Sequence, residues 1–219
     1  MNFLKIRPNE KRPILILFII FFCITGACIT GAAVRDAIFL INFDRTYLPL
    51  MYIFIALFMA LAIEAYKKLT SNKNQINLMI LAGSFFSISL LVFQLHMAGW
   101  VIPAFYIWME IITILSIMQF WILAGEVFNP RQAKRLFPLI IAGGSIAAIG
   151  AGYSIKPFVE IYGSENLLYL TIIFLIISII MSHFVRPYIK VDIQEIDQNI
   201  HDNKVQFDPY LKAIAIMFA

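Results

Sequence analysis

Residues 105–152 read FYIWMEIITILSIMQFWILAGEVFNPRQAKRLFPLIIAGGSIAAIGAG, and this stretch decides the class of fold. It is an apolar segment, a short basic segment and a second apolar segment rich in glycine. Glu110 is the only charged residue between Val101 and Gly125. A charge near the middle of a membrane helix costs about 2.5–3.5 kcal/mol on insertion scales. We therefore expect Glu110 to face the interior of a helix bundle, a partner or water.

The composition extends this interpretation to the whole chain. Of the 219 residues, 61% are hydrophobic and only 14% are charged, whereas a soluble domain has about 25% charged residues. No strand-length alternation is present, and only helices or closed barrels cross a bilayer. We predict an all-α integral membrane protein whose surroundings are the lipid bilayer. Basic residues are scattered between apolar segments, so no nucleic-acid partner is expected, and neither a metal nor another cofactor is predicted.

Six apolar segments are long enough to cross a hydrocarbon core of about 30 Å. We predict spans over residues 13–34, 47–66 and 78–97, one around Glu110, and then 138–155 and 167–185. A signal peptide is the competing interpretation of the first segment, but its apolar run exceeds the usual ~7–15 residues. The last segment consists almost entirely of Leu, Ile and Phe, which predicts a lipid-facing helix.

Three regions follow from this pattern. Residues 1–185 are predicted to form a six-helix transmembrane bundle. Residues 186–208 are polar, without an apolar period, and are expected to be a cytoplasmic linker. Residues 209–219 turn apolar again but are too short to span a bilayer, so we interpret them as the start of a truncated seventh helix.

Basic residues are distributed unequally between the two ends of the spans. If the N-terminus is cytoplasmic, twelve basic residues lie inside and three outside. The inside set is Lys5, Arg7, Lys11, Arg12, Lys67, Lys68, Lys73, Arg131, Lys134, Arg135, Arg186 and Lys190, and the outside set is Arg35, Arg45 and Lys156. An excess of Lys and Arg marks cytoplasmic loops. We expect a multi-pass protein of the cell (inner) membrane with a cytoplasmic N-terminus.

Two helix faces carry distinctive residues. Steps of three and four along the fourth span place Tyr106, Glu110, Thr113, Ile117 and Trp121 on one face. In the fifth span, small residues spaced by four are predicted to form a ridge that another helix approaches closely. This ridge comprises Gly144, Ala148 and Gly152.

Six spans, a linker and the start of a seventh span are typical of half of a two-repeat transporter. In such folds each six-helix half is one repeat, and the substrate binds between the halves. The predicted partner is therefore a missing C-terminal half or a second copy of this chain. The span count alone indicates no substrate.

Several motifs resemble one family of such transporters. Met109-Glu110, Gln119-Phe120-Trp121 and residues 132–139, QAKRLFPL, are similar to the fourth-helix and following-loop signature of the ADP/ATP translocase family of plastids and intracellular bacteria. That family shows a Glu, then Leu-Phe-Trp, then Glu-Ala-Lys-Arg-Phe-Tyr-Pro-Leu at like spacing. Arg35-Asp36 and Tyr47-Leu48-Pro49 resemble its first loop. Gln132 stands where the family motif has Glu.

The resemblance implies a major-facilitator-like fold, of which this chain is the N-terminal half-bundle. It implies a transporter that exchanges a small anionic solute such as ATP or ADP by alternating access. It also implies that Arg35, next to Asp36, contacts substrate phosphates and that Glu110 gates or couples exchange.

Each site residue also has a structural interpretation. Arg35 and Asp36 are alternatively an interfacial ion pair, and Glu110 a protonated carboxyl group bonded to Thr113 or to a neighbouring helix. Lys134 and Arg135 are expected to set topology and bind headgroup phosphates, or else to latch a cytoplasmic gate. The glycine ridge alternatively serves helix packing alone.

The alternative function is a non-transporting packing or assembly module, or a truncated carrier remnant. An enzyme is not expected, since the spans contain neither a His/Asp/Glu cluster nor a Ser-His pair.

Overall fold

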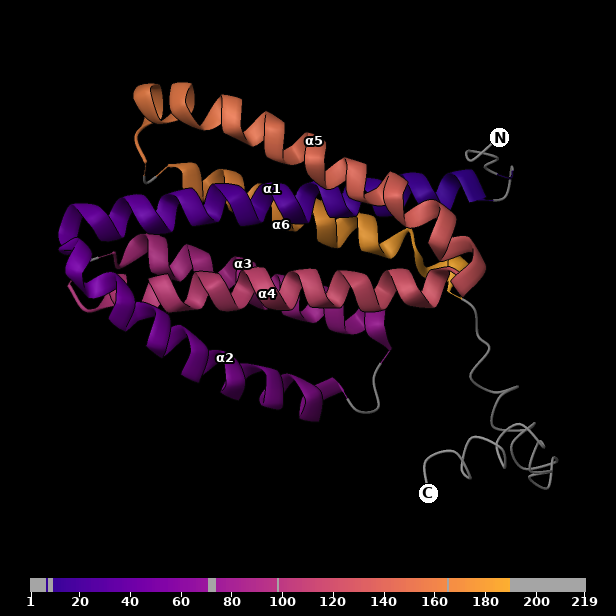
Figure 1. Ribbon diagram of the computed structural model, residues 1–219, viewed down its shortest axis with the longest axis horizontal. Coiled ribbons are helices and arrows are strands. Elements are labelled where there is room, and N and C mark those ends of the chain that lie inside the picture. The colour runs from indigo at the N-terminus through magenta and orange to yellow at the C-terminus, as the bar shows by residue number, and fades with distance from the viewer. Residues whose placement is uncertain (1–6, 8–9, 71–73, 98, 165, 190–219) are drawn as a thin grey trace, which may run out of the picture. The chain divides into compact units, whose positions relative to one another are not determined.

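A computed structural model describes residues 7, 10–70, 74–97, 99–164 and 166–189 (Figure 1). Every regular element that these residues form is a helix. The α-helices are α1 (Lys11–Asn42), α2 (Leu48–Thr70), α3 (Gln75–Leu95), α4 (Val101–Val127), α5 (Pro130–Tyr162) and α6 (Leu167–His183). Two short 3-10 helices are η2 (Arg45–Tyr47) and η3 (Arg186–Tyr188).

The lengths and composition of these helices confirm a helical, multi-pass membrane protein. Within the described residues, five helices are long and apolar enough to span a membrane, and α6 is an apolar helix of 17 residues. From residue 190 on, the predicted linker and the predicted start of a seventh helix lie outside the described residues. The first predicted linker residues form η3, where the Arg186 guanidinium donates to Asn77 Oδ1 at 2.9 Å.

Two helices are longer than their apolar segments. α1 continues through Arg35 and Asp36, so these residues lie inside a helix and not in a loop. α5 begins at Pro130 and includes Pro138, which places Lys134 and Arg135 in its first turns. A helix of 32 residues is about 48 Å long, so α1 exceeds a hydrocarbon core of about 30 Å.

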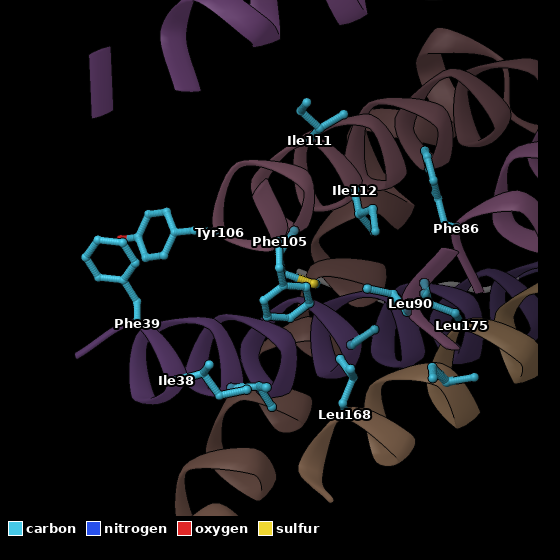
Figure 2. Close-up of a cluster of buried hydrophobic side chains, with 14 of the residues drawn as sticks. Ile38, Phe39, Phe86, Leu90, Phe105, Tyr106, Ile111, Ile112, Leu168 and Leu175 are labelled. Atoms are coloured by element: carbon cyan, nitrogen blue, oxygen red, sulfur yellow. The ribbon is translucent and has the colours of Figure 1, made fainter. Parts of the chain in front are cut away.

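α1 packs against α4, α5 and α6, while α3 packs against α4 and α6, and α2 packs against α4. Buried side chains from α1, α3, α4 and α6 meet in one cluster (Figure 2). Its members include Ile38, Phe39, Phe86, Leu90, Phe105, Tyr106, Ile112, Leu168 and Leu175. The core therefore lies along α1 and α4, the two helices that carry Arg35 and Glu110.

α6 turns one face into this core. Leu168, Thr171 and Ser182 are fully buried. The Thr171 hydroxyl lies 2.9 Å from that of Thr30 in α1, and Gly26 of α1 lies against the ring of Phe174. The prediction that this span simply faces lipid is wrong for that face, because its few small and hydroxyl residues pack against α1 and α3.

α1 and α5 approach each other through glycine. A Cβ atom at Gly143 would lie 3.0 Å from the carbonyl oxygen of Phe18, and one at Gly144 would lie 2.6 Å from Cε1 of Phe21. The buried face of α5 also includes Ala147 and Ala151. Of the predicted ridge, Gly144 thus lies against α1, whereas Ala148 and Gly152 are exposed.

Candidate functional site

The charged residues predicted in α1 and α4 meet in the structure. The Arg35 guanidinium donates through Nε to Asp36 Oδ1 at 2.9 Å and through Nη1 to Glu110 Oε2. The side chain of Arg35 is 11% exposed, that of Glu110 29% and that of Asp36 49%. The structure therefore joins Arg35, Asp36 and Glu110 in one site, buried at the arginine and open at Asp36.

An aromatic wall supports the arginine. The guanidinium carbon of Arg35 lies 4.6 Å from the centre of the Tyr106 ring. Tyr106 is in α4, about one helical turn before Glu110. Such a cation–π contact is worth about 0.5–2 kcal/mol, depending on desolvation. The ring centres of Tyr106 and Phe39 are 4.8 Å apart with the ring planes inclined by 51°, and the two side chains lie next to each other in Figure 2. Both rings are buried in the core, so Phe39 holds the Tyr106 ring against which the Arg35 guanidinium packs.

The site lies away from the ends of both helices. Arg35 is seven positions before Asn42, the end of α1, and Glu110 is nine positions after Val101, the start of α4. These separations correspond to about 10 Å and 14 Å along the helix axes. The ion pair therefore lies in the half of the bundle nearer the α1–α2 and α3–α4 connections.

Close approach of α1 to α4 makes this pairing possible. At Gly31, one turn before Arg35, an added Cβ atom would overlap the Met109 side chain. The alternative partner for Glu110, Thr113, instead donates to the carbonyl oxygen of Met109 at 3.0 Å. Glu110 is therefore bonded to α1 rather than to its own helix.

The three charged groups give the site a formal charge of −1 when both carboxylates are ionised. Removing one partner of a buried ion pair leaves an uncompensated charge, which is strongly destabilising. Protonation of a carboxylate, or an incoming anion at Arg35, would change which group holds the arginine. The arrangement can thus exchange one partner for another, which is the chemistry that a coupling site needs.

A second charged cluster lies at the opposite end of α1 and was not predicted from the sequence. The Glu10 carboxylate accepts hydrogen bonds from the Arg7 backbone N–H at 3.0 Å, from Gln132 Nε2 at 3.2 Å and from the Arg135 guanidinium at 2.6 Å. The Glu10 side chain is only 6% exposed. The Arg7 hydrogen bond, followed by the charge of Arg135, lowers the pKa of Glu10 although its burial opposes this shift.

Lys134 and Arg135 were predicted to act together, but only Arg135 belongs to this cluster. Arg135 is half-buried and binds Glu10, whereas Lys134 is exposed. Gln132 serves the cluster twice, because its Oε1 also accepts from the Asn129 N–H at 3.2 Å at the start of α5. The amide at position 132 therefore has a local role that a carboxylate could fill only in part.

The remaining motif residues join the helices. Phe120 and Trp121 of α4 contact Phe21 of α1, with ring centres 4.7 and 5.3 Å apart. Trp121 also contacts Phe137 of α5 at 5.2 Å. Gln119 is buried, and its carbonyl oxygen accepts from Gln75 Nε2 at 3.4 Å. The aromatic contacts thus join α1, α4 and α5, and the Gln75–Gln119 hydrogen bond joins α3 to α4.

Among the described residues, no group of three or more His, Cys, Asp or Glu side chains could hold a metal ion. Comparisons with protein-family models, with curated proteins and with solved structures gave no match to this chain.

Proposed function

We propose that this chain forms one half of a membrane solute carrier that works by alternating access, with a major-facilitator-like arrangement of its helices. The observation that carries the proposal is the Arg35–Glu110 ion pair, which joins α1, just beyond its uncharged run of residues 13–34, to the apolar span of α4. Ionisable groups at such positions are costly and are expected to be functional. A pair shared by two helices links the state of the site to the relative position of those helices.

In this mechanism Arg35 exchanges partners. With Glu110 ionised, Arg35 holds α4 against α1 while also binding Asp36. Protonation of Glu110, or binding of an anion to Arg35, weakens that connection and favours a second arrangement of the helices. A ligand shifts such an equilibrium only by its difference in affinity for the two states, so the solute has to compete with Glu110 for the arginine.

The proposed solute is a small anion such as ATP or ADP, on the strength of the motif resemblance. One further observation favours a solute with a planar ring. A pocket of about 520 Å³ between α1, α2 and α4 includes Phe39, which also contacts Tyr106 of the charged site. Aromatic side chains form much of its lining, which suits stacking on a base. They are Phe39, Phe43, Tyr47, Phe54, Phe58 and Trp100.

The proposal includes a partner and an orientation. A second six-helix half, either further along the chain or in a second copy, would complete the solute path. The excess of basic residues at the end of the bundle that holds the start of α1 and of α5 supports a cytoplasmic position for that end. The apparent mass of the native protein tests the first point, because one continuous carrier would run at about twice 25.1 kDa.

The solute is tested by uptake into liposomes that contain the purified protein together with its partner half. The proposal expects labelled ATP to enter ADP-loaded liposomes, and unlabelled ADP but not a neutral sugar to compete. Uptake of a different solute would refute the nucleotide assignment and keep the carrier. Absence of flux for every solute in a broad panel would favour the alternative, a non-transporting packing or assembly module.

A further inference from the structure

A polar pocket lies where the residues before α1 meet the start of α5. Its volume is about 360 Å³, and it is lined by Arg7, Glu10, Asn129, Arg131, Gln132 and Arg135. The Arg35 site is near the other end of α1, and the proposed transport mechanism does not use this pocket. We refer to it as the corner pocket.

The corner pocket is positively charged. Three guanidinium groups and one carboxylate line it, which gives a formal charge of +2. Arg7 and Arg131 are exposed, while Glu10 is buried and Arg135 is half-buried. The positive groups that can reach an incoming ligand are therefore Arg7 and Arg131.

The deeper part of the pocket already binds an oxyanion, the carboxylate of Glu10. Arg135, Gln132 and the Arg7 backbone N–H all donate to it. Within the described residues, the guanidinium groups of Arg7 and Arg131 make neither a hydrogen bond nor a salt bridge, although the charge of Arg7 also favours the ionised form of Glu10. The hydrogen bonds of Glu10 thus hold the start of α1 against the start of α5. They leave the guanidinium groups of Arg7 and Arg131 for a second anion.

We propose that the corner pocket binds a phosphate group, contributed by a phospholipid headgroup or by a soluble phosphate compound. The planar guanidinium groups of Arg7 and Arg131 match pairs of phosphate oxygens and form charge-assisted hydrogen bonds with them. The pocket lies beyond the apolar part of α1 and at the first turn of α5, the level at which headgroups meet a spanning bundle. Its volume leaves room for more than a single phosphate group.

Lys134 provides a matched control. It carries the same charge as Arg131, lies in the same part of α5 and is exposed, but it does not line the pocket. General attraction of a basic surface to anions would depend equally on both residues. Binding of a phosphate group inside the corner pocket should depend on Arg131, which lines it, and not on Lys134.

The test measures the thermal unfolding of the purified protein in phosphatidylcholine nanodiscs. Phosphatidylglycerol is added to the lipid in one arm, and inorganic phosphate is added in the other against sodium chloride of equal ionic strength. We expect at least one addition to stabilise the wild-type protein and the Lys134→Gln variant. The Arg7→Gln/Arg131→Gln variant should bind the same probe about tenfold more weakly. Both arginines are exposed, so these substitutions should leave the fold intact in plain phosphatidylcholine.

The two arms distinguish the sources of the phosphate group. Stabilisation by phosphatidylglycerol alone identifies a lipid headgroup, and stabilisation by inorganic phosphate identifies a site open to soluble phosphate. The proposal is overturned if neither probe stabilises the wild-type protein. It is equally overturned if Lys134→Gln weakens the response as much as the Arg7→Gln/Arg131→Gln substitutions do.

Discussion

The guanidinium of Arg35 in α1 donates to the carboxylate of Glu110 in α4, although the two residues are 75 positions apart in the sequence. The bond crosses between two helices of the core, at a point where Gly31 lets Met109 come close. It gives Glu110 a partner for its charge inside the apolar span of α4, and it gives Arg35 a second partner besides Asp36. A carrier that changes shape has to break such a bond reversibly.

Removing one partner should destabilise the bundle, and removing the arginine should cost more. Glu110→Gln leaves Arg35 bound to Asp36, whereas Arg35→Gln leaves two carboxylates without their cation. Loss of one partner from a fully buried pair costs about 3–5 kcal/mol, and partial exposure of Glu110 lowers this value. Thermal unfolding in detergent should rank the proteins as wild type, then Glu110→Gln, then Arg35→Gln. The charge-swapped Arg35→Glu/Glu110→Arg protein should recover part of the loss, and no recovery would contradict a direct pair.

Gly144 and Gly152 should respond in opposite ways to the same substitution. In Gly144→Ala the new methyl group lies 2.6 Å from Phe21, a ring that is itself stacked on Phe120. Overpacking of this kind costs about 1–3 kcal/mol. In Gly152→Ala the methyl group meets nothing within 4 Å, so stability should stay equal or rise by at most about 1 kcal/mol. Equal losses in the two variants would show that α5 does not contact α1 through Gly144.

The amide of Gln132 should be needed as a donor. Gln132→Glu keeps an oxygen that accepts from the Asn129 N–H but places a second carboxylate beside Glu10. We expect a loss of about 1–3 kcal/mol, typical of a buried polar group that loses its partner. Glu10→Gln in the Gln132→Glu background should restore stability, because the amide and the carboxylate then exchange places. A double variant as unstable as the sum of the single variants would contradict this pairing.

The connection between Glu10 and α5 should weaken in acid. Because folding lowers the pKa of Glu10 below its ordinary value of 4.5, the ionised carboxylate stabilises the folded state at higher pH. That contribution is complete above the ordinary value and is lost as the pH falls through the lower, folded-state pKa. The difference in unfolding free energy between wild type and Glu10→Gln should be constant near neutral pH and shrink in acid. A difference in unfolding free energy that grows in acid would contradict a lowered pKa of Glu10 in the folded protein.

Long uncharged apolar runs were sufficient to predict the helical class and the approximate positions of the spans, because the bilayer requires such segments. The helix ends were less predictable. Arg35 and Asp36 read as a loop because they interrupt an apolar run, yet each finds a partner in the bundle and the helix continues to Asn42. Pro138 likewise reads as a helix start, although α5 begins at Pro130.

The site was predictable as separate residues but not as a set of contacts. An isolated carboxylate in an apolar segment singled out Glu110, and the motif resemblance singled out Arg35, but their pairing depends on how α1 lies against α4. The contact face of α5 depends in the same way on its partner, since Gly143, Gly144, Ala147 and Ala151 have the spacing of small residues that the predicted ridge also has. Glu10 gave no signal, because a carboxylate among basic residues before a span is ordinary.

The central claim is that the Arg35–Glu110 pair couples solute movement to helix movement. Its most direct test uses ADP-loaded liposomes that contain the protein together with its partner half, and compares initial rates of labelled-ATP uptake for wild type, Glu110→Gln and Glu126→Gln. Glu126 is an exposed carboxylate near the end of α4, so its variant controls for loss of a charge from the same helix. We predict that Glu110→Gln falls to the rate of protein-free liposomes at equal protein incorporation while Glu126→Gln keeps the wild-type rate. Uptake by Glu110→Gln at the wild-type rate would contradict the claim.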